Sequence, residues 1–167
     1  MTLTGKGNYF EDFEAGQVFR HARGKTMCEQ DNVGITLQVL NTAEGHFNED
    51  VMQRNALALG DGRGGWNSRL QFGGVTIAMV IGLAMQDTGE NALRELKLDK
   101  IRLKAPVFHG DTLYAYTEVL ETAEAGQDDA GIVTFKHWGT NQDDKIVFEG
   151  ERTVLLKRKS HHGAKPQ

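Results

Sequence analysis

The chain has 167 residues, which is enough for one domain with a buried core and too few for two domains of ordinary size. Its 23 acidic and 19 basic residues give a formal net charge of -4 at pH 7. This balance supplies no basic field that would attract nucleic acid or anionic lipid, so we expect neither as a partner.

Three features of the sequence favour a cytoplasmic location. Cys28 is the single cysteine, which excludes an internal disulfide. The first residues lack the basic and then apolar pattern of a signal peptide. The longest apolar stretch, 75–85, has about half of the roughly 20 residues that span a bilayer, so we expect no membrane span.

The N-terminal part of the chain predicts one strand followed by a helix. Val18–Thr26 predicts a strand, although it holds few apolar residues. Thr26 and Glu29 have the spacing of a capping box, which predicts that a helix begins there. Val33, Leu37 and Leu40 recur on one helical stripe, so we expect this helix to reach about Leu40.

Two further helices are expected before the chain turns to strands. Asn48 has the character of an N-cap for a short helix that reaches about Leu57, which leaves Asn41–Phe47 as a loop. Gly60–Gly65 is too rich in glycine for regular structure. An apolar helix follows from about Gly74, and its composition indicates that it is buried.

The C-terminal part predicts an antiparallel sheet. Alternating side chains and polar turns predict four strands, at Leu98–Ala105, Thr112–Glu121, Ile132–Gly139 and Ile146–Leu156. Helices followed by a strand meander indicate an α+β domain, in which the sheet wraps around the one apolar helix as in a hot-dog fold. We expect this domain to cover residues 1–157 and the basic tail 158–167 to be disordered.

Three stretches resemble the MaoC-like (R)-specific enoyl-CoA hydratase and dehydratase family, whose fold is the hot dog. They are Tyr9–Gln17, Asn41–His46 and Pro106–Leu113, and they occur in the family's order. The first and third mark the fold. The second corresponds to the family's hydratase motif, in which an acidic residue precedes a histidine by five positions. Asn in place of the acidic residue makes the chain similar to the branch of itaconyl-CoA and mesaconyl-CoA hydratases.

His46 is the candidate acid and base of this motif, because imidazole exchanges protons near neutral pH. Asn41 stands at the acidic position and cannot act as a base, but its carboxamide could hold a water molecule against His46. Ala43 and Glu44 replace the family's asparagine and proline. Two plainer interpretations stay open. Asn41 could be a helix end in a left-handed conformation, and His46 could be an exposed loop histidine.

Gly73 and Gly74 begin the apolar helix, where free backbone N–H groups favour a developing negative oxygen. The resemblance implies that the amide of Gly73 donates to the thioester carbonyl, although both glycines could instead permit close packing. Arg63 and Arg69 are candidates for binding a substrate carboxylate or a coenzyme A phosphate. They could also be solvated charges or dimer contacts.

These features predict a hydratase or dehydratase acting on a short, dicarboxylic 2-enoyl-CoA, with coenzyme A as part of the substrate, no separate cofactor and no metal. Two alternatives are a non-catalytic acyl-CoA-binding or assembly subunit and a hot-dog thioesterase. By resemblance, a hot-dog thioesterase would carry a carboxylate or a nucleophile on the central helix. Residues 74–86 contain no Asp, Glu or Cys, so this alternative is disfavoured. Since one sheet leaves an open edge, we expect a homodimer or a larger assembly of dimers. The particular substrate and the direction of the reaction stay open.

Overall fold

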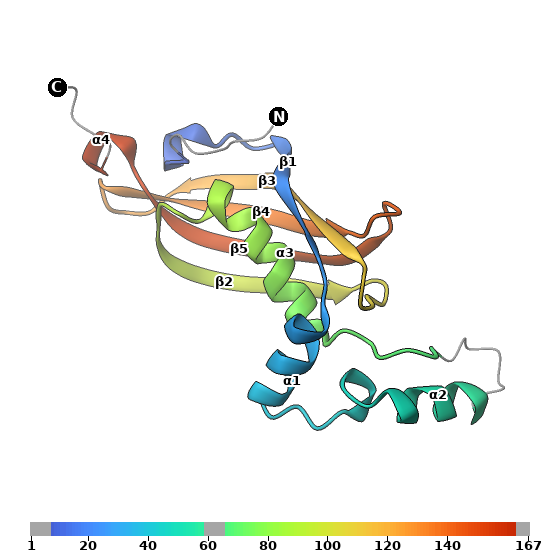
Figure 1. Cartoon of the computed structure of the whole chain (residues 1–167). Helices are drawn as coiled ribbons and strands as arrows, with labels where there is room; N and C mark the ends of the chain where they lie inside the picture. The colour runs from blue at the N-terminus through green and yellow to red at the C-terminus, as the bar shows by residue number, and fades with distance from the viewer. Residues whose placement is uncertain (1–7, 59–65, 163–167) are drawn as a thin grey trace.

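A computed structural model describes residues 8–58 and 66–162 of the chain. Five strands form one antiparallel sheet in the order β1-β3-β4-β5-β2. Their bounds are β1 (Val18–Thr26), β2 (Ala92–Leu103), β3 (Thr112–Glu124), β4 (Ala130–Thr140) and β5 (Ile146–Lys157). The helix α3 (Gly73–Thr88) lies across one face of this sheet (Figure 1). The predicted architecture, a sheet around one apolar helix, is confirmed.

The core lies between α3 and the sheet because both present apolar side chains there. Val75, Val80 and Leu83 of α3 pack with buried residues of the sheet into one cluster. A side-chain carbon on Gly139 of β4 would overlap Val80, so this glycine allows the helix its close approach. Side chains of β3 alternate between buried and half-buried along much of the strand, as a sheet covered on one face requires.

Strand β2 differs from its predicted range. It begins at Ala92, six residues before the expected Leu98, and ends at Leu103 instead of Ala105. The sequence did not predict this earlier start, because the charged residues Arg94 and Glu95 interrupt the alternation of apolar and polar side chains. The backbone of β2 nevertheless pairs with β5 as far back as Ala92, which lies opposite Leu156. The predicted strands β3, β4 and β5 are confirmed with small extensions at their ends.

The capping box predicted at Thr26 is wrong. Thr26 is the last residue of β1, and its hydroxyl lies 2.8 Å from that of Thr112 across the strand pair. The corresponding contact is made two residues later, where the Cys28 N–H donates to Asp31 at 2.9 Å. A π-helical segment, η2 (Gln30–Gly34), then leads into the short helix α1 (Ile35–Gln38).

The apolar stripe of this helix is largely exposed. The side chains of Leu37 and Leu40 are 52% and 85% exposed, whereas Thr36 is buried. In Figure 1, α1 and α2 (Glu49–Ala58) extend beyond one end of the sheet and do not lie on its face. The 3.6-residue period was therefore a correct sign of a helix but gave no information about what the helix packs against.

Helix α2 confirms its prediction, because the Val51 N–H donates to the side chain of Asn48 at 3.2 Å in an N-cap. The expected glycine-rich loop 60–65 lies outside the described residues.

At the other end of the chain, Lys159–His162 forms the short helix α4, although we expected the tail 158–167 to be disordered. The Arg158 guanidinium stacks on the ring of Phe10 at 4.5 Å, which anchors this turn; residues 163–167 are not described.

A chain of buried polar groups ties the C-terminal end of α3 to the sheet. His21 Nδ1 lies 2.6 Å from the Asp87 carboxylate, and His21 Nε2 lies 2.7 Å from the Thr117 hydroxyl. That hydroxyl lies 2.8 Å from His137 Nδ1. Burial lowers the pKa of His21 despite the raising effect of Asp87. Burial, helped by the nearby charge of Arg152, lowers the pKa of His137 to about 3.

Within residues 8–58 and 66–162, none of the helices has the combination of length and apolar composition that a membrane crossing requires.

Candidate active site

A cavity of about 390 Å³ opens at the N-terminal end of α3. Its walls come from three places in the chain: His46, the segment 66–76, and the segment 103–107, which begins at the last residue of β2. Most of the lining is apolar, but His46, Gln71, Thr76 and Lys104 contribute polar groups. An apolar hollow with a few convergent polar groups is the usual form of a small-molecule site.

The environment of His46 fixes which ring nitrogen carries the proton. His46 ends the short 3-10 helix η3 (Glu44–His46), and its Nδ1 lies 2.9 Å from the backbone oxygen of Leu70. A carbonyl oxygen can only accept, so Nδ1 is the donor and Nε2 of the neutral ring keeps its lone pair. The ring also lies against Phe72, with centroids 5.6 Å apart. His46 is therefore oriented to accept a proton at Nε2.

Asn32 holds together the segments that form this site. Its side-chain amide donates to the backbone oxygens of His46 at 2.9 Å and Leu70 at 3.1 Å. Its side-chain oxygen accepts from the Phe72 N–H at 2.8 Å. One carboxamide thus positions the histidine, the carbonyl that orients it, and the residue before the first glycine of α3. Asn32 lies in the π-helical segment η2, and such segments are frequent at functional sites.

Asn32 was not predicted from the sequence, because its partners are 14, 38 and 40 positions away. We expect Asn32→Asp to lower kcat for the reaction of this site by about ten- to a hundredfold, since a carboxylate cannot donate to the two carbonyls and His46 would shift. The measurement is kcat and KM side by side, with thermal unfolding as a check. Recovery of kcat in Asn32→Gln would support a positioning role, whereas an unchanged kcat in Asn32→Asp would exclude it.

Gly73 lies in the same cavity as His46. Phe72 is the N-cap of α3, so Gly73 and Gly74 occupy the first two helical positions, whose N–H groups have no acceptor within the helix. A side-chain carbon on Gly73 would overlap Leu103, and one on Gly74 would overlap the ring of Phe72. A side chain at either position would therefore make its neighbour shift, while the position of Gly73 also suits the predicted oxyanion donor. Gly74 is not among the described residues that line the cavity.

Asn41 lies at the end of α1 and starts the loop that carries His46. Its side-chain oxygen accepts from the Ala43 N–H at 3.0 Å, and its own N–H donates to the backbone oxygen of Thr36 at 3.0 Å. The left-handed residue at this helix end is Leu40, with a φ of 57°, so the plainer interpretation of Asn41 as that residue is wrong. Asn41 is not among the described residues lining the cavity.

Arg69 is engaged by carboxylates of its own chain. Its Nε lies 2.8 Å from Glu49, and its terminal nitrogen lies 2.5 Å from Glu29. These partners, Glu49 foremost, raise the pKa of the guanidinium above its usual range. Arg69 lines a separate hollow together with His109, so the structure does not bring it into the cavity of His46. Arg63, the other arginine predicted to bind substrate, lies outside the described residues.

Three polar residues of the cavity were not singled out from the sequence. Gln71 and Thr76 are both buried, and the Gln71 amide donates to the Thr76 hydroxyl at 3.2 Å. Lys104 follows the last residue of β2. The only sequence signal for Gln71 and Thr76 was their position beside Gly73 and Gly74. Lys104 had none, because it lies within a stretch that was interpreted as a strand.

Comparison with known proteins places the chain in a family. A family model described as mesaconyl-CoA hydratase matches residues 2–158. The mesaconyl-CoA hydratase of Haloarcula marismortui is 36% identical over 167 residues, which cover 93% of this chain and 44% of that protein. The chain therefore spans about half the length of the curated relative.

Solved structures agree with the hot-dog fold. A MaoC domain protein from Chloroflexus aurantiacus matches with a TM-score of 0.80 and 26% identity, covering 98% of this chain and 44% of its own. A protein from Mycobacterium tuberculosis with a double hotdog fold matches with a TM-score of 0.64 and 24% identity, covering 95% and 46%. The chain therefore belongs to the mesaconyl-CoA hydratase family of MaoC-like hot-dog proteins.

Proposed function

We propose that the chain adds water to the double bond of a short dicarboxylic 2-enoyl-CoA, such as mesaconyl-CoA, and catalyses the reverse dehydration. The observation that carries the proposal is that His46 and the N-terminal Gly73 of α3 line one cavity. This arrangement supports a base and an oxyanion donor acting together, as hydration of a conjugated thioester requires. The family and its mesaconyl-CoA hydratase relative support the substrate class.

The proposed reaction begins with His46. Nε2 removes a proton from water while the water oxygen bonds to the β-carbon of the enoyl group. The electron pair of the double bond moves toward the thioester, whose oxygen becomes an enolate held by the Gly73 N–H. The protonated His46 then returns its proton to the α-carbon, which restores the thioester and the neutral ring. The Leu70 carbonyl that accepts from Nδ1 keeps the imidazole oriented throughout.

Asn41 has a supporting role in this proposal. Since its side chain bonds to the Ala43 N–H, Asn41 shapes the loop that ends at His46. Binding of the nucleophilic water by Asn41 stays a prediction, as does binding of substrate by Arg63 and Arg69.

The cytoplasm stays the expected location of the chain. Its single cysteine, Cys28, forms no disulfide within the chain.

The proposal is tested by following the absorbance of the enoyl-thioester band with crotonyl-, mesaconyl- and itaconyl-CoA. We expect loss of absorbance with at least one carboxylated substrate, faster than with crotonyl-CoA. Binding of all three thioesters without any loss of absorbance would contradict the proposal and favour a non-catalytic acyl-CoA-binding subunit.

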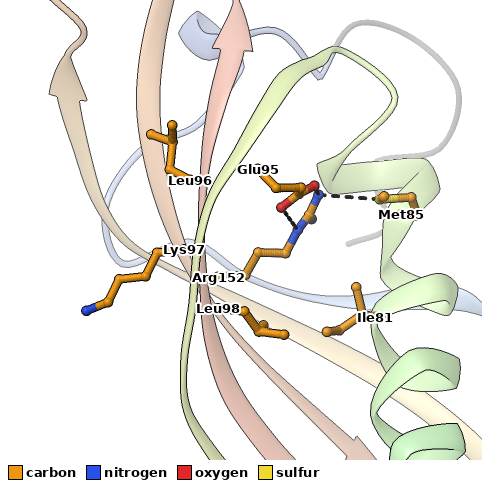
Figure 2. Close-up of a pocket in the computed structure, with 7 residues that line it drawn as sticks. All are labelled: Ile81, Met85, Glu95, Leu96, Lys97, Leu98 and Arg152. Carbon is orange, nitrogen blue, oxygen red and sulfur yellow. Dashed lines mark hydrogen bonds and ion pairs between the residues drawn. The ribbon is translucent and has the colours of Figure 1, made fainter.

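A second hot-dog unit is proposed to cover the edge of the sheet. Strand β2 ends the strand order, and its exposed apolar side chains include Leu93, Leu98 and Leu103. Beside it lies a hollow of about 460 Å³ between β2 and α3, whose apolar walls include Ile81 and Met85 (Figure 2). An open edge with apolar side chains requires a cover in solution.

The length of the relatives supports a second unit of this kind as the cover, because this chain matches only 44% of the curated relative and 44% and 46% of the two solved structures. Relatives of about twice this length have room for two such units, and one of them has a double hotdog fold. We therefore expect two copies of this chain to pair as a homodimer. Light scattering on the purified chain should give about twice its mass of 18.5 kDa, and Leu98→Glu should shift the mass toward the monomer. A stable monomer with full hydratase activity would contradict the assembly.

A further inference from the structure

The proposed substrate carries a second carboxylate, and this group must be neutralised when it enters a largely apolar cavity. An unpaired carboxylate in such surroundings is strongly disfavoured, so the site needs a cation within reach. The arginines singled out from the sequence do not supply it in the described structure: Arg69 is paired with Glu49 and Glu29 in another hollow, and Arg63 is not described.

Lys104 is the one lysine or arginine among the described residues that line the cavity of His46. Its backbone is fixed beside β5, since its N–H donates to the oxygen of Val147 at 2.9 Å. The preceding Leu103 is close enough to Gly73 to overlap a side chain placed there. Lys104 therefore directly follows a residue that lies against the proposed oxyanion donor, and both Lys104 and Gly73 line the cavity.

The ammonium group of Lys104 is loosely held. Its Nζ lies 3.4 Å from Glu149, and the two side chains are 43% and 25% exposed. Charge-assisted hydrogen bonds are usually near 2.7–2.9 Å, so little is lost when Lys104 exchanges this partner for another carboxylate. The flexible four-carbon stem allows the ammonium to turn toward a bound anion. By contrast, Arg69 is held by two closer carboxylates.

We propose that Lys104 is the specificity-determining cation of the cavity, and that its ammonium binds the distal carboxylate of a dicarboxylic acyl-CoA. The inference rests on the proposed function, which it deepens by naming the residue that selects the substrate. Lys104 makes no bond to a reacting atom in this scheme. Its contribution is to distinguish a carboxylated acyl group from an uncharged group of similar size.

The test compares carboxylated with uncharged ligands in binding and in turnover. The variants are Lys104→Gln, which removes the charge, Lys104→Arg, which keeps it, and Lys100→Gln as a matched control. Lys100 also lies toward the end of β2 and pairs with Glu151 at 2.9 Å, but it does not line the cavity. Succinyl-CoA and butyryl-CoA, which have no double bond, report binding by calorimetry; mesaconyl-CoA and crotonyl-CoA report kcat/KM.

For Lys104→Gln we expect the affinity for succinyl-CoA and kcat/KM for mesaconyl-CoA to fall by about ten- to a hundredfold. The values for butyryl-CoA and crotonyl-CoA should change by less than about threefold, and Lys104→Arg and Lys100→Gln should stay near wild type. Equal losses for charged and uncharged ligands, or no loss for either, would overturn the assignment of Lys104. A wild type that prefers succinyl-CoA through Lys104 but hydrates neither substrate would support the assignment and overturn the proposed function.

Discussion

Replacing His46 with alanine is expected to lower kcat/KM for the preferred 2-enoyl-CoA by about a hundred- to ten-thousandfold. The variant loses the imidazole Nε2, which is the base for water and the acid for the α-carbon in the proposed reaction. The fold should tolerate the change, because the side chain is only half-buried and loses one hydrogen bond, worth about 1 kcal/mol. The measurement is the initial rate of loss of the enoyl-thioester absorbance.

Two controls separate the chemistry of His46 from its structural contact. Glutamine at this position retains an N–H that can donate to the Leu70 oxygen but provides no base. We therefore expect His46→Gln to be as inactive as His46→Ala while unfolding at nearly the wild-type temperature. His109 lies in the turn before β3 and is 58% exposed, so His109→Ala should retain its activity. An active His46→Gln enzyme would show that the base lies elsewhere.

Acidification is expected to destabilise the chain, beginning below about pH 6.5, because of the two buried histidines. His21 and His137 have pKa values below the ordinary value of 6.5 in the folded protein, and that of His137 is lowered to about 3. The unfolded chain therefore binds more protons than the folded chain as the pH falls from 6.5 toward 3. Each imidazole that stays neutral when folded then removes about 1.4 kcal/mol of stability per pH unit. Urea unfolding at several pH values measures this slope.

The variant His137→Phe isolates one of these groups. Phenylalanine is close in size to histidine but cannot bind a proton, and the Thr117 hydroxyl keeps His21 as a partner. Between pH 6 and pH 4 we expect the variant to lose about 3 kcal/mol less stability than wild type. His162 is more exposed and lies in α4, so His162→Asn serves as the control with an unchanged slope. An identical slope in His137→Phe would show that folding does not lower the pKa of His137.

The sequence predicted those elements whose side-chain pattern is decided by the core. Helix α3 and strands β3 to β5 face each other, so their apolar residues recur with the period of the element. The start of β2 was missed because much of its surface is exposed in the single chain, where charged residues such as Arg94 are permitted. Thr26 was misassigned because a threonine followed by a glutamate three positions later also occurs where a strand ends.

The sequence predicted only those residues of the site that belong to a recognisable local pattern. His46 and Gly73 were named from the hydratase-like motif and the start of an apolar helix, and the structure places both in one cavity. Asn32 and Lys104 could not be found in this way, because their importance depends on contacts between distant segments. Arg69 shows that proximity in sequence alone does not bring a side chain into this cavity. Although it precedes Gly73 by four positions, its guanidinium pairs with Glu29 and Glu49.

The central claim is that this cavity adds water across the double bond of a dicarboxylic enoyl-CoA. It is tested most directly by incubating the purified protein with mesaconyl-CoA in water enriched in heavy oxygen and determining the product mass. We expect a hydroxyacyl-CoA that has gained one labelled water molecule, formed by wild type and not by His46→Gln. Recovery of free coenzyme A and a labelled acid would reveal a thioesterase, and unchanged mesaconyl-CoA would show that the chain does not carry out this reaction.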